Sequence, residues 1–164
     1  MIVVVSDTSP IRALAFLGQI SLLETLFGTV VVPPAVAEEL RNPARRGPGE
    51  LPLDLSMHRF IEVRAPADRA RVAQLENELD RGESEALVLA EEIGAQAVLM
   101  DESAGRTVAE RMGLVPLGTV GILLRGKRAG LLTELRPFLD RLTQDLGFFI
   151  TEPVRRWTLD QAGE

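Results

Sequence analysis

Short runs of aliphatic and β-branched residues alternate along the chain with segments in which apolar residues recur every three or four positions. The runs span residues 3–5, 29–32, 60–63, 97–100 and 114–117, and each is followed by Ser, Pro, Arg, Asp or Gly. Such runs are typical of strands that are buried on both faces of a sheet. Their alternation with helical segments predicts βαβ units, and therefore a mostly parallel sheet with right-handed crossovers.

The spacing of apolar residues and the helix-ending residues place helices between these strands. We expect helices over residues 10–17, 21–27, 35–41, 66–79, 83–93, 103–112, 118–128 and 133–146. Residues 43–56 are rich in Pro and Gly and predict a surface loop. The tail, residues 148–164, predicts an edge strand followed by a terminal helix.

Composition narrows the chemistry that the chain can perform. Its 164 residues, of which 46% are hydrophobic and 26% charged, are typical of one compact folded domain. The absence of cysteine excludes disulfides and thiolate metal sites, and a single histidine disfavours zinc sites and histidine-based triads. A bound metal would therefore be a hard cation held by oxygen atoms.

Charge and hydropathy bear on location and partners. The N-terminus lacks the basic region of a signal peptide, and no apolar run approaches the ~20 residues that span a membrane. These features predict a cytoplasmic protein without membrane association. The net charge of −6 argues against a general nucleic-acid coat protein, because phosphate binding depends mainly on Lys and Arg. It leaves nucleic acid open as a substrate, since a bound cation would neutralise a carboxylate cluster.

Two of the expected strands end in an aspartate, Asp7 and Asp101. Ligands of open parallel sheets bind beyond the carboxyl ends of the strands, so both side chains are expected in one crevice. Like charges this close favour a bound cation or a raised pKa. Ser9 is expected to cap the helix that follows Asp7, and Ser103 the helix that follows Asp101. An aspartate before a helix also caps free N–H groups, and this alternative stays open for Asp101.

Two glutamates are candidates to complete an acidic set. Glu39 flanks the buried stripe of its helix, and Glu83 opens an apolar helix on which Glu85 is its competitor. Judged singly, each is also typical of a solvated helix face or a first-turn dipole partner. Together with the two aspartates they supply the oxygen ligands that Mg²⁺ and Mn²⁺ prefer. Such a site could activate water for attack on a phosphodiester.

The four acidic segments, in their order and spacing, resemble the PIN domain family over about residues 2–128. The likeness is to prokaryotic PIN-like proteins related to the VapC-type toxin ribonucleases. It is carried by Val-Val-Ser-Asp7-Thr-Ser-Pro, Val36-Ala-Glu-Glu39-Leu, Gly82-Glu83-Ser-Glu-Ala-Leu and Val98-Leu-Met-Asp101-Glu.

This resemblance implies a three-layer α/β/α sandwich and an endoribonuclease that depends on Mg²⁺ or Mn²⁺. It also implies roles for particular residues. The catalytic and metal-binding acids are, in order, Asp7, Glu39, Glu83, where many relatives carry Asp, and Asp101. Ser9 matches a small polar residue that orients the first carboxylate, Glu85 is the alternative third acid, and Glu102 is an additional acid near the fourth.

Further expectations concern domains and partners. Residues 1–164 are expected to form a single PIN-like domain, with residues 129–164 as its C-terminal helical extension. The partners are an RNA substrate, an antitoxin protein if the chain is the toxin of a toxin–antitoxin pair, and a second copy in a homodimer. The arginines proposed to contact RNA phosphates are Arg12 and Arg106, with Arg45-Arg46 and residues 125–128 as further basic groups.

Two other classes of function remain open at this stage. One is a PIN-like protein with weak or no catalytic activity that acts through metal and protein or RNA binding. The other is an acyl-phosphate enzyme or receiver domain with Asp7 as the phosphoacceptor. Against the latter, no aspartate stands two positions after Asp7, and no lysine follows the late strand, where Leu117-Gly118 occurs.

Overall fold

A five-stranded parallel sheet forms the centre of the computed structural model, which describes residues 2–45 and 47–164. The strand order is β3-β2-β1-β4-β5, and every pairing is parallel, as expected. The strands are β1 (Ile2–Ser6), β2 (Gly28–Val32), β3 (Ile61–Val63), β4 (Ala97–Leu99) and β5 (Pro116–Leu117). The last strand is shorter than its apolar run predicts.

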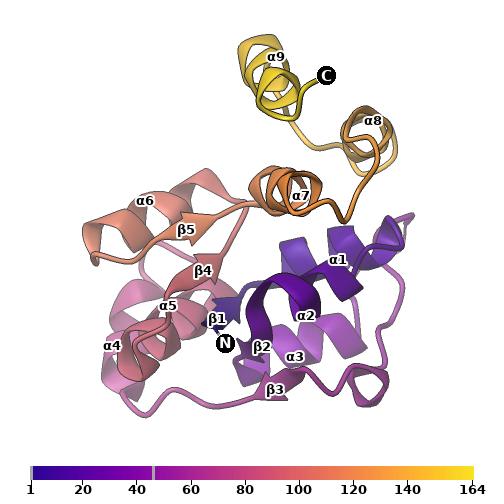
Figure 1. The fold of residues 1–164 in the computed structure, drawn as a ribbon. Coiled ribbons are helices and arrows are strands. Elements are labelled where there is room, and N and C mark those ends of the chain that lie inside the picture. The colour runs from indigo at the N-terminus through magenta and orange to yellow at the C-terminus, as the bar shows by residue number, and fades with distance from the viewer. Residues whose placement is uncertain (1, 46) are drawn as a thin grey trace.

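Helices cover both faces of this sheet and make the expected three-layer α/β/α sandwich (Figure 1). One face packs against α4 (Arg69–Leu75), α5 (Arg81–Ile93) and α6 (Ser103–Arg111). The other packs against α1 (Thr8–Phe16), α2 (Ser21–Phe27), α3 (Pro34–Arg41) and α7 (Thr119–Arg128), and α8 (Arg136–Gln144) and α9 (Glu152–Gln161) extend that layer outward. A 3₁₀ turn, η1 (Leu55–Met57), follows the Pro-rich segment. None of these helices combines the length and apolar character that crossing a bilayer requires.

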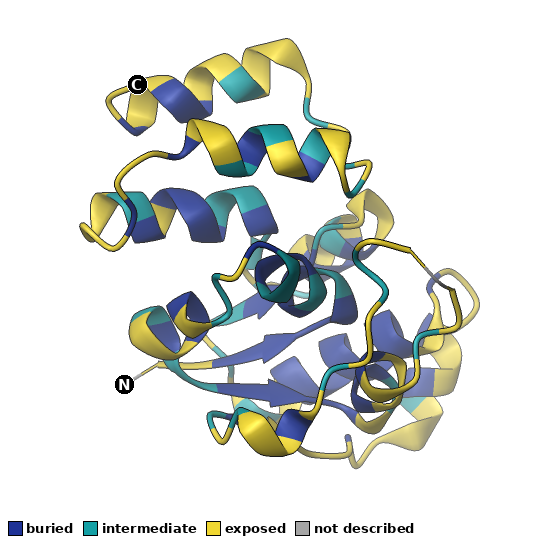
Figure 2. Ribbon diagram, turned by 90° about the vertical axis from the view of Figure 1, so that its right-hand side faces the viewer, coloured by how far each residue is buried: buried dark blue, intermediate teal, exposed yellow. Residues whose placement is uncertain are grey.

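The central strands are buried on both faces, which explains why their sequences do not alternate between apolar and polar residues. Val4 lies in the core beneath α1 and α7, whereas Val5 lies in the core beneath α5, and neither is exposed to solvent. Figure 2 shows the strands as buried elements between helices whose outer sides are exposed. The apolar runs therefore mark the middle layer of the sandwich.

Three expectations about helix ends and the tail were wrong. Helix α1 begins at Thr8, so Asp7 and not Ser9 holds the N-cap position. Glu102 rather than Ser103 holds the N-cap position of α6. In both cases the helix starts one or two residues earlier than the serine predicts, and the N-cap side chain accepts no capping hydrogen bond. Residues 148–151 form no edge strand; instead, the Thr151 side chain caps α9.

The helix α5 is defined at both ends by local chemistry. At its start, the Asp80 carboxylate accepts the Glu83 N–H at 2.8 Å, and the Glu83 carboxylate accepts the Asp80 N–H at 3.2 Å. This reciprocal capping box places the start at Arg81, two residues before the expected one. At its end, Gly94 takes the left-handed conformation with φ of 62°, which confirms it as the expected stop.

The C-terminal residues fold back onto the core. Leu139, Leu142 and Leu159 belong to the same buried cluster as residues of α1 and α7. The Glu164 carboxylate accepts the Leu135 N–H at 2.6 Å and lies 3.4 Å from the Lys127 ammonium group. It thereby joins the end of the chain to the start of α8 and to α7.

The two-sided packing of β4 gives a testable consequence. Leu99 is fully buried, so Leu99→Ala should lower the free energy of unfolding by about 2–5 kcal/mol through lost contacts and the cavity left behind. The control is Leu51→Ala, because Leu51 is 72% exposed and its truncation should change stability by no more than about 0.5 kcal/mol. Urea denaturation measures both variants. Equal losses would contradict the described packing.

Candidate active site

Asp7 lies at the point where the strand order reverses. The chain runs from β1 outward through β2 and β3 and then returns to pair β4 with the other side of β1. Crevices at such switch points are where open parallel sheets bind ligands. The Asp7 N–H donates to the Leu99 carbonyl at 2.9 Å, so the residue remains tied to β4. Only 6% of it is exposed, and its carboxylate is therefore largely shielded from water.

Glu39 approaches Asp7 across Gly82. A Cβ atom at Gly82 would lie 3.5 Å from Asp7 Oδ1 and 3.3 Å from Glu39 Oε1. The missing side chain thus leaves only a narrow space, barely large enough for a methyl group, which one oxygen of each carboxylate borders. Glu39 comes from α3 and Gly82 from the first turn of α5, so this space lies where β1, α3 and α5 meet.

The carboxylates near this space disturb one another electrostatically. Burial, with smaller contributions from the charges of Asp80, Glu83 and Glu39, raises the pKa of Asp7 from its ordinary value of 3.8 to about 8, although a hydrogen bond from the Thr8 backbone lowers it in part. Burial also raises the pKa of Glu83, with Asp80 as the next largest cause and smaller contributions from Glu102 and Glu39. At neutral pH and without a cation, Asp7 therefore holds a proton.

The structure separates Glu83 from its competitor Glu85. The charge of Glu83 raises the pKa of Asp7, whereas Glu85 is 1% exposed and accepts the Ala35 N–H at 3.1 Å, at the start of α3. Arg69 and Arg81 each lie 3.4 Å from a Glu85 oxygen. The Glu85 charge is thus neutralised by two arginines, and its carboxylate connects α5 to the N-terminus of α3.

The Asp101 side chain is engaged at the start of α7. Its carboxylate accepts the Ser9 hydroxyl at 2.6 Å, the Thr119 N–H at 2.7 Å and the Thr119 hydroxyl at 2.8 Å. It therefore caps α7, and not the helix α6 that follows it in sequence. Asp101 is also absent from the charges that raise the pKa of Asp7. Ser9 was expected beside the Asp7 carboxylate. Its hydroxyl instead connects α1 to the Asp101 carboxylate.

The arginines expected near the site differ in their surroundings. Arg106 donates to the Met100 carbonyl at 3.1 Å and lies next to Asp101 across Gly118. Arg12 pairs with Glu50 at 2.7 Å and donates to the Glu39 carbonyl at 2.8 Å, so its guanidinium group is held within the protein. The exposed Arg45 lies on the surface, and Arg46 is outside the described residues.

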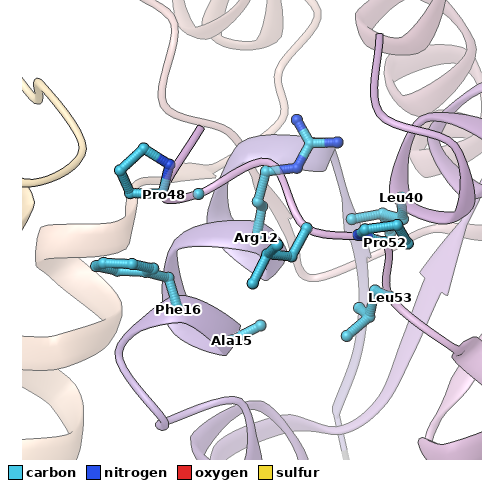
Figure 3. Close-up of a pocket in the computed structure, with 9 residues that line it drawn as sticks. Arg12, Ala15, Phe16, Leu40, Pro48, Pro52 and Leu53 are labelled. Carbon is cyan, nitrogen blue, oxygen red and sulfur yellow. The ribbon is translucent and has the colours of Figure 1, made fainter. Parts of the chain in front are cut away.

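Arg12 also borders an apolar cavity of about 210 Å³ (Figure 3). Its walls are formed by α1, Leu40 of α3 and the Pro-rich segment, and Figure 3 shows Arg12 between Phe16 on one side and Pro52 and Leu53 on the other. No Asp or Glu is among its lining residues, so this cavity is not the crevice of the acidic residues.

The acidic residues have the oxygen ligands that divalent cations prefer, but the described side chains do not converge on one point. Within residues 2–45 and 47–164, no three acidic or histidine side chains converge closely enough to hold a single ion. Asp7 and Glu39 nevertheless face one space, and every candidate ligand is a carboxylate oxygen. Oxygen-only ligands suit Mg²⁺ and Mn²⁺, and a cation here would relieve the repulsion that raises the pKa of Asp7.

A family model described as a PIN domain matches residues 3–164. The chain belongs to the PIN domain family. A search of curated proteins found no match. PIN domains are generally nucleases that use divalent metal ions, and PIN nucleases typically bind RNA. The family match agrees with the fold.

Sequence reasoning missed three residues that the structure places at this candidate site. Asp80 could have been found, because the pattern Asp80-x-x-Glu83 is a capping box. Gly82 leaves the space between the acids, and a glycine inside a helix is a recognisable signal of close approach. Thr8 donates its hydroxyl to Glu39 Oε2 at 2.5 Å, across 31 residues, and no local pattern indicates that contact.

The raised pKa of Asp7 predicts how stability depends on pH when divalent cations are removed. Between pH 4 and 8 the folded protein binds this proton and the unfolded chain does not, since its pKa is about 3.8 unfolded and about 8 folded. The stabilisation of the folded state by this proton is therefore complete below pH 4 and is lost as the pH rises through 8. Each unit of difference between the folded and unfolded pKa corresponds to about 1.4 kcal/mol.

Urea denaturation in EDTA from pH 5 to 9 measures this dependence. We expect the urea midpoint of the wild type to fall with rising pH. The midpoint of Asp7→Asn should fall less, and its remaining pH dependence comes from the raised pKa of Glu83. A wild-type midpoint that stays constant or rises over this range would contradict the raised pKa.

Proposed function

We propose that this PIN domain is an endoribonuclease that hydrolyses RNA phosphodiesters and depends on Mg²⁺ or Mn²⁺. The observation that supports it best is the pair Asp7 and Glu39, whose oxygens face one space at the switch point of the sheet. The charge of Glu83 acts on Asp7, and Asp101 accepts the hydroxyl of Ser9, two residues after Asp7. Carboxylates in this position suit metal-assisted hydrolysis.

In this proposal Asp7, Glu39 and Glu83 hold the cation, and Asp101 completes the catalytic set. When bound, the cation would lower the pKa of a water molecule and stabilise charge on the phosphate oxygens. Asp7 must give up its proton on binding, while the exposed Glu39 can reach the water or substrate from the solvent side. Ser9 orients Asp101, and Glu102 adds charge near Glu83. We leave Glu85 out of the metal set because two arginines already neutralise it.

The substrate and partners follow from the same site. Arg106 lies beside Asp101 at Gly118 and is proposed to contact an RNA phosphate. We assign Arg12 to holding the Pro-rich segment instead, because Glu50 already pairs with it. The motif Asp7-Thr-Ser-Pro supports a finer role as the toxin of a cytoplasmic toxin–antitoxin pair, in which an antitoxin protein covers the acidic crevice.

The apolar tail suggests a place for a homodimer contact. Phe149 is 92% exposed and Trp157 is 58% exposed, and both belong to the segment that we propose as the C-terminal extension of a single domain. Large exposed aromatic residues of this kind are enriched at protein interfaces.

A second candidate function is a PIN domain with weak or no catalytic activity that binds a cation and RNA or protein. One observation favours it: the described acidic side chains do not converge on a single point. The hydrogen bonding of Asp101 points the same way, because three donors already occupy much of the capacity of its oxygens. This candidate predicts metal binding without cleavage.

Cleavage assays on structured and single-stranded RNAs in Mg²⁺, Mn²⁺ or EDTA distinguish the two candidate functions. We expect metal-dependent cleavage by the wild-type chain and a loss of at least about 100-fold in Asp7→Asn, because a charge-stabilising group is removed. Asp160→Asn makes the same chemical change on exposed α9 and should leave the rate unchanged. Full cleavage by Asp7→Asn would contradict the proposal. Mn²⁺ binding that depends on Asp7 without cleavage would support the second candidate.

A further inference from the structure

We infer that Thr8 is a positioning residue, whose hydroxyl holds Glu39 so that one carboxylate oxygen faces Asp7. This inference rests on the proposed function, because it concerns the same acidic site. The residue directly follows Asp7 and opens α1. It is therefore placed to set the geometry between the first and second acids.

The contact divides the two oxygens of Glu39 between two tasks. Glu39 Oε2 accepts the Thr8 hydroxyl at 2.5 Å. Glu39 Oε1 is the oxygen that faces Gly82 and, across it, Asp7 Oδ1. Holding the first oxygen thus directs the second toward Asp7, with which Glu39 is proposed to share the cation.

Glu39 needs such a contact because little else fixes its side chain. It lies on an exposed position of α3, and a glutamate has several rotatable bonds whose freedom is lost when it is held. Within the described residues, Thr8 is the one donor to its carboxylate, since Arg12 donates to the Glu39 main-chain carbonyl. Without the Thr8 hydroxyl, the carboxylate would be free to turn toward solvent.

Thr8 suits this task because it is buried and stiff. Its side chain is packed away from solvent, and β-branching restricts its χ1 angle. Inside a helix a threonine hydroxyl often bonds to the carbonyl one turn earlier. Thr8 is the first residue of α1 and has no preceding helical turn, so its hydroxyl is available to Glu39.

The test compares Thr8→Val, which keeps the shape and removes the hydroxyl, with Thr8→Ser, which keeps the hydroxyl. Calorimetry gives the Mn²⁺ Kd, and cleavage assays give kcat and KM for RNA. We expect Thr8→Val to weaken Mn²⁺ binding and kcat by about 10–100-fold with little change in KM, the range seen when residues that orient metal ligands are removed. Thr8→Ser should recover most of the loss.

Two controls separate positioning from a general structural effect. Thr107→Val removes an exposed hydroxyl that bonds only to the Ser103 carbonyl of its own helix, and it should match the wild type. In a Glu39→Gln background, Thr8→Val should add little further loss, because both variants disturb the same carboxylate. Additive losses, or equal behaviour of Thr8→Val and Thr8→Ser, would overturn the inference.

The outcomes also distinguish this inference from the proposed function. If the wild type binds Mn²⁺ but cuts no RNA, the ribonuclease proposal fails, and the Mn²⁺ affinities of the Thr8 variants still decide the role of Thr8. If the wild type cuts RNA and both Thr8 variants equal it, only the inference fails. A wild-type chain that neither binds Mn²⁺ nor cuts RNA overturns both.

Discussion

The buried carboxylate of Asp7 is the constraint on which the site depends. A carboxylate that is shielded from water and surrounded by other acids is costly in its charged form unless something compensates it. Among the described residues, no Arg or Lys is one of the groups that shift the pKa of Asp7, and Arg12, Arg69 and Arg81 pair with Glu50 and Glu85 instead. A proton or a bound cation is then what balances Asp7. The raised pKa and the proposed metal dependence are two consequences of this one arrangement.

The fold produces this arrangement by burying its central strand. β1 is covered on both faces and paired on both edges. Asp7, the residue after it, therefore lies at the switch point of the sheet, where its backbone N–H donates to β4. Helix α3 then brings Glu39 from one side, and the capped start of α5 brings Glu83 and Gly82 from another. Arginine pairs stabilise the surroundings, while the acids that face the crevice stay unpaired with arginine or lysine among the described residues.

Much of this could be predicted from sequence, because apolar runs and helical spacing are local signals. They located the five strands, the parallel pairing and the positions of Asp7, Glu39 and Glu83. The expected caps Ser9 and Ser103 were wrong because each serine competes with neighbouring positions for the cap, and the Ser9 hydroxyl bonds to Asp101 instead. The partners of Glu85, Asp101 and Thr8 could not be predicted, because they lie 50, 18 and 31 residues away in the chain. Such contacts depend on how whole elements pack.

The most direct test of this account is the number of protons that the protein releases when it binds Mn²⁺. Calorimetric titrations at pH 7 in buffers of different ionisation enthalpy give that number, and metal ligands must be deprotonated to bind. Because Asp7 has a pKa of about 8, we expect about one proton released per ion by the wild type, and weaker binding with less release by Asp7→Asn. Tight Mn²⁺ binding without proton release, unchanged in Asp7→Asn, would contradict the central place given to this buried carboxylate.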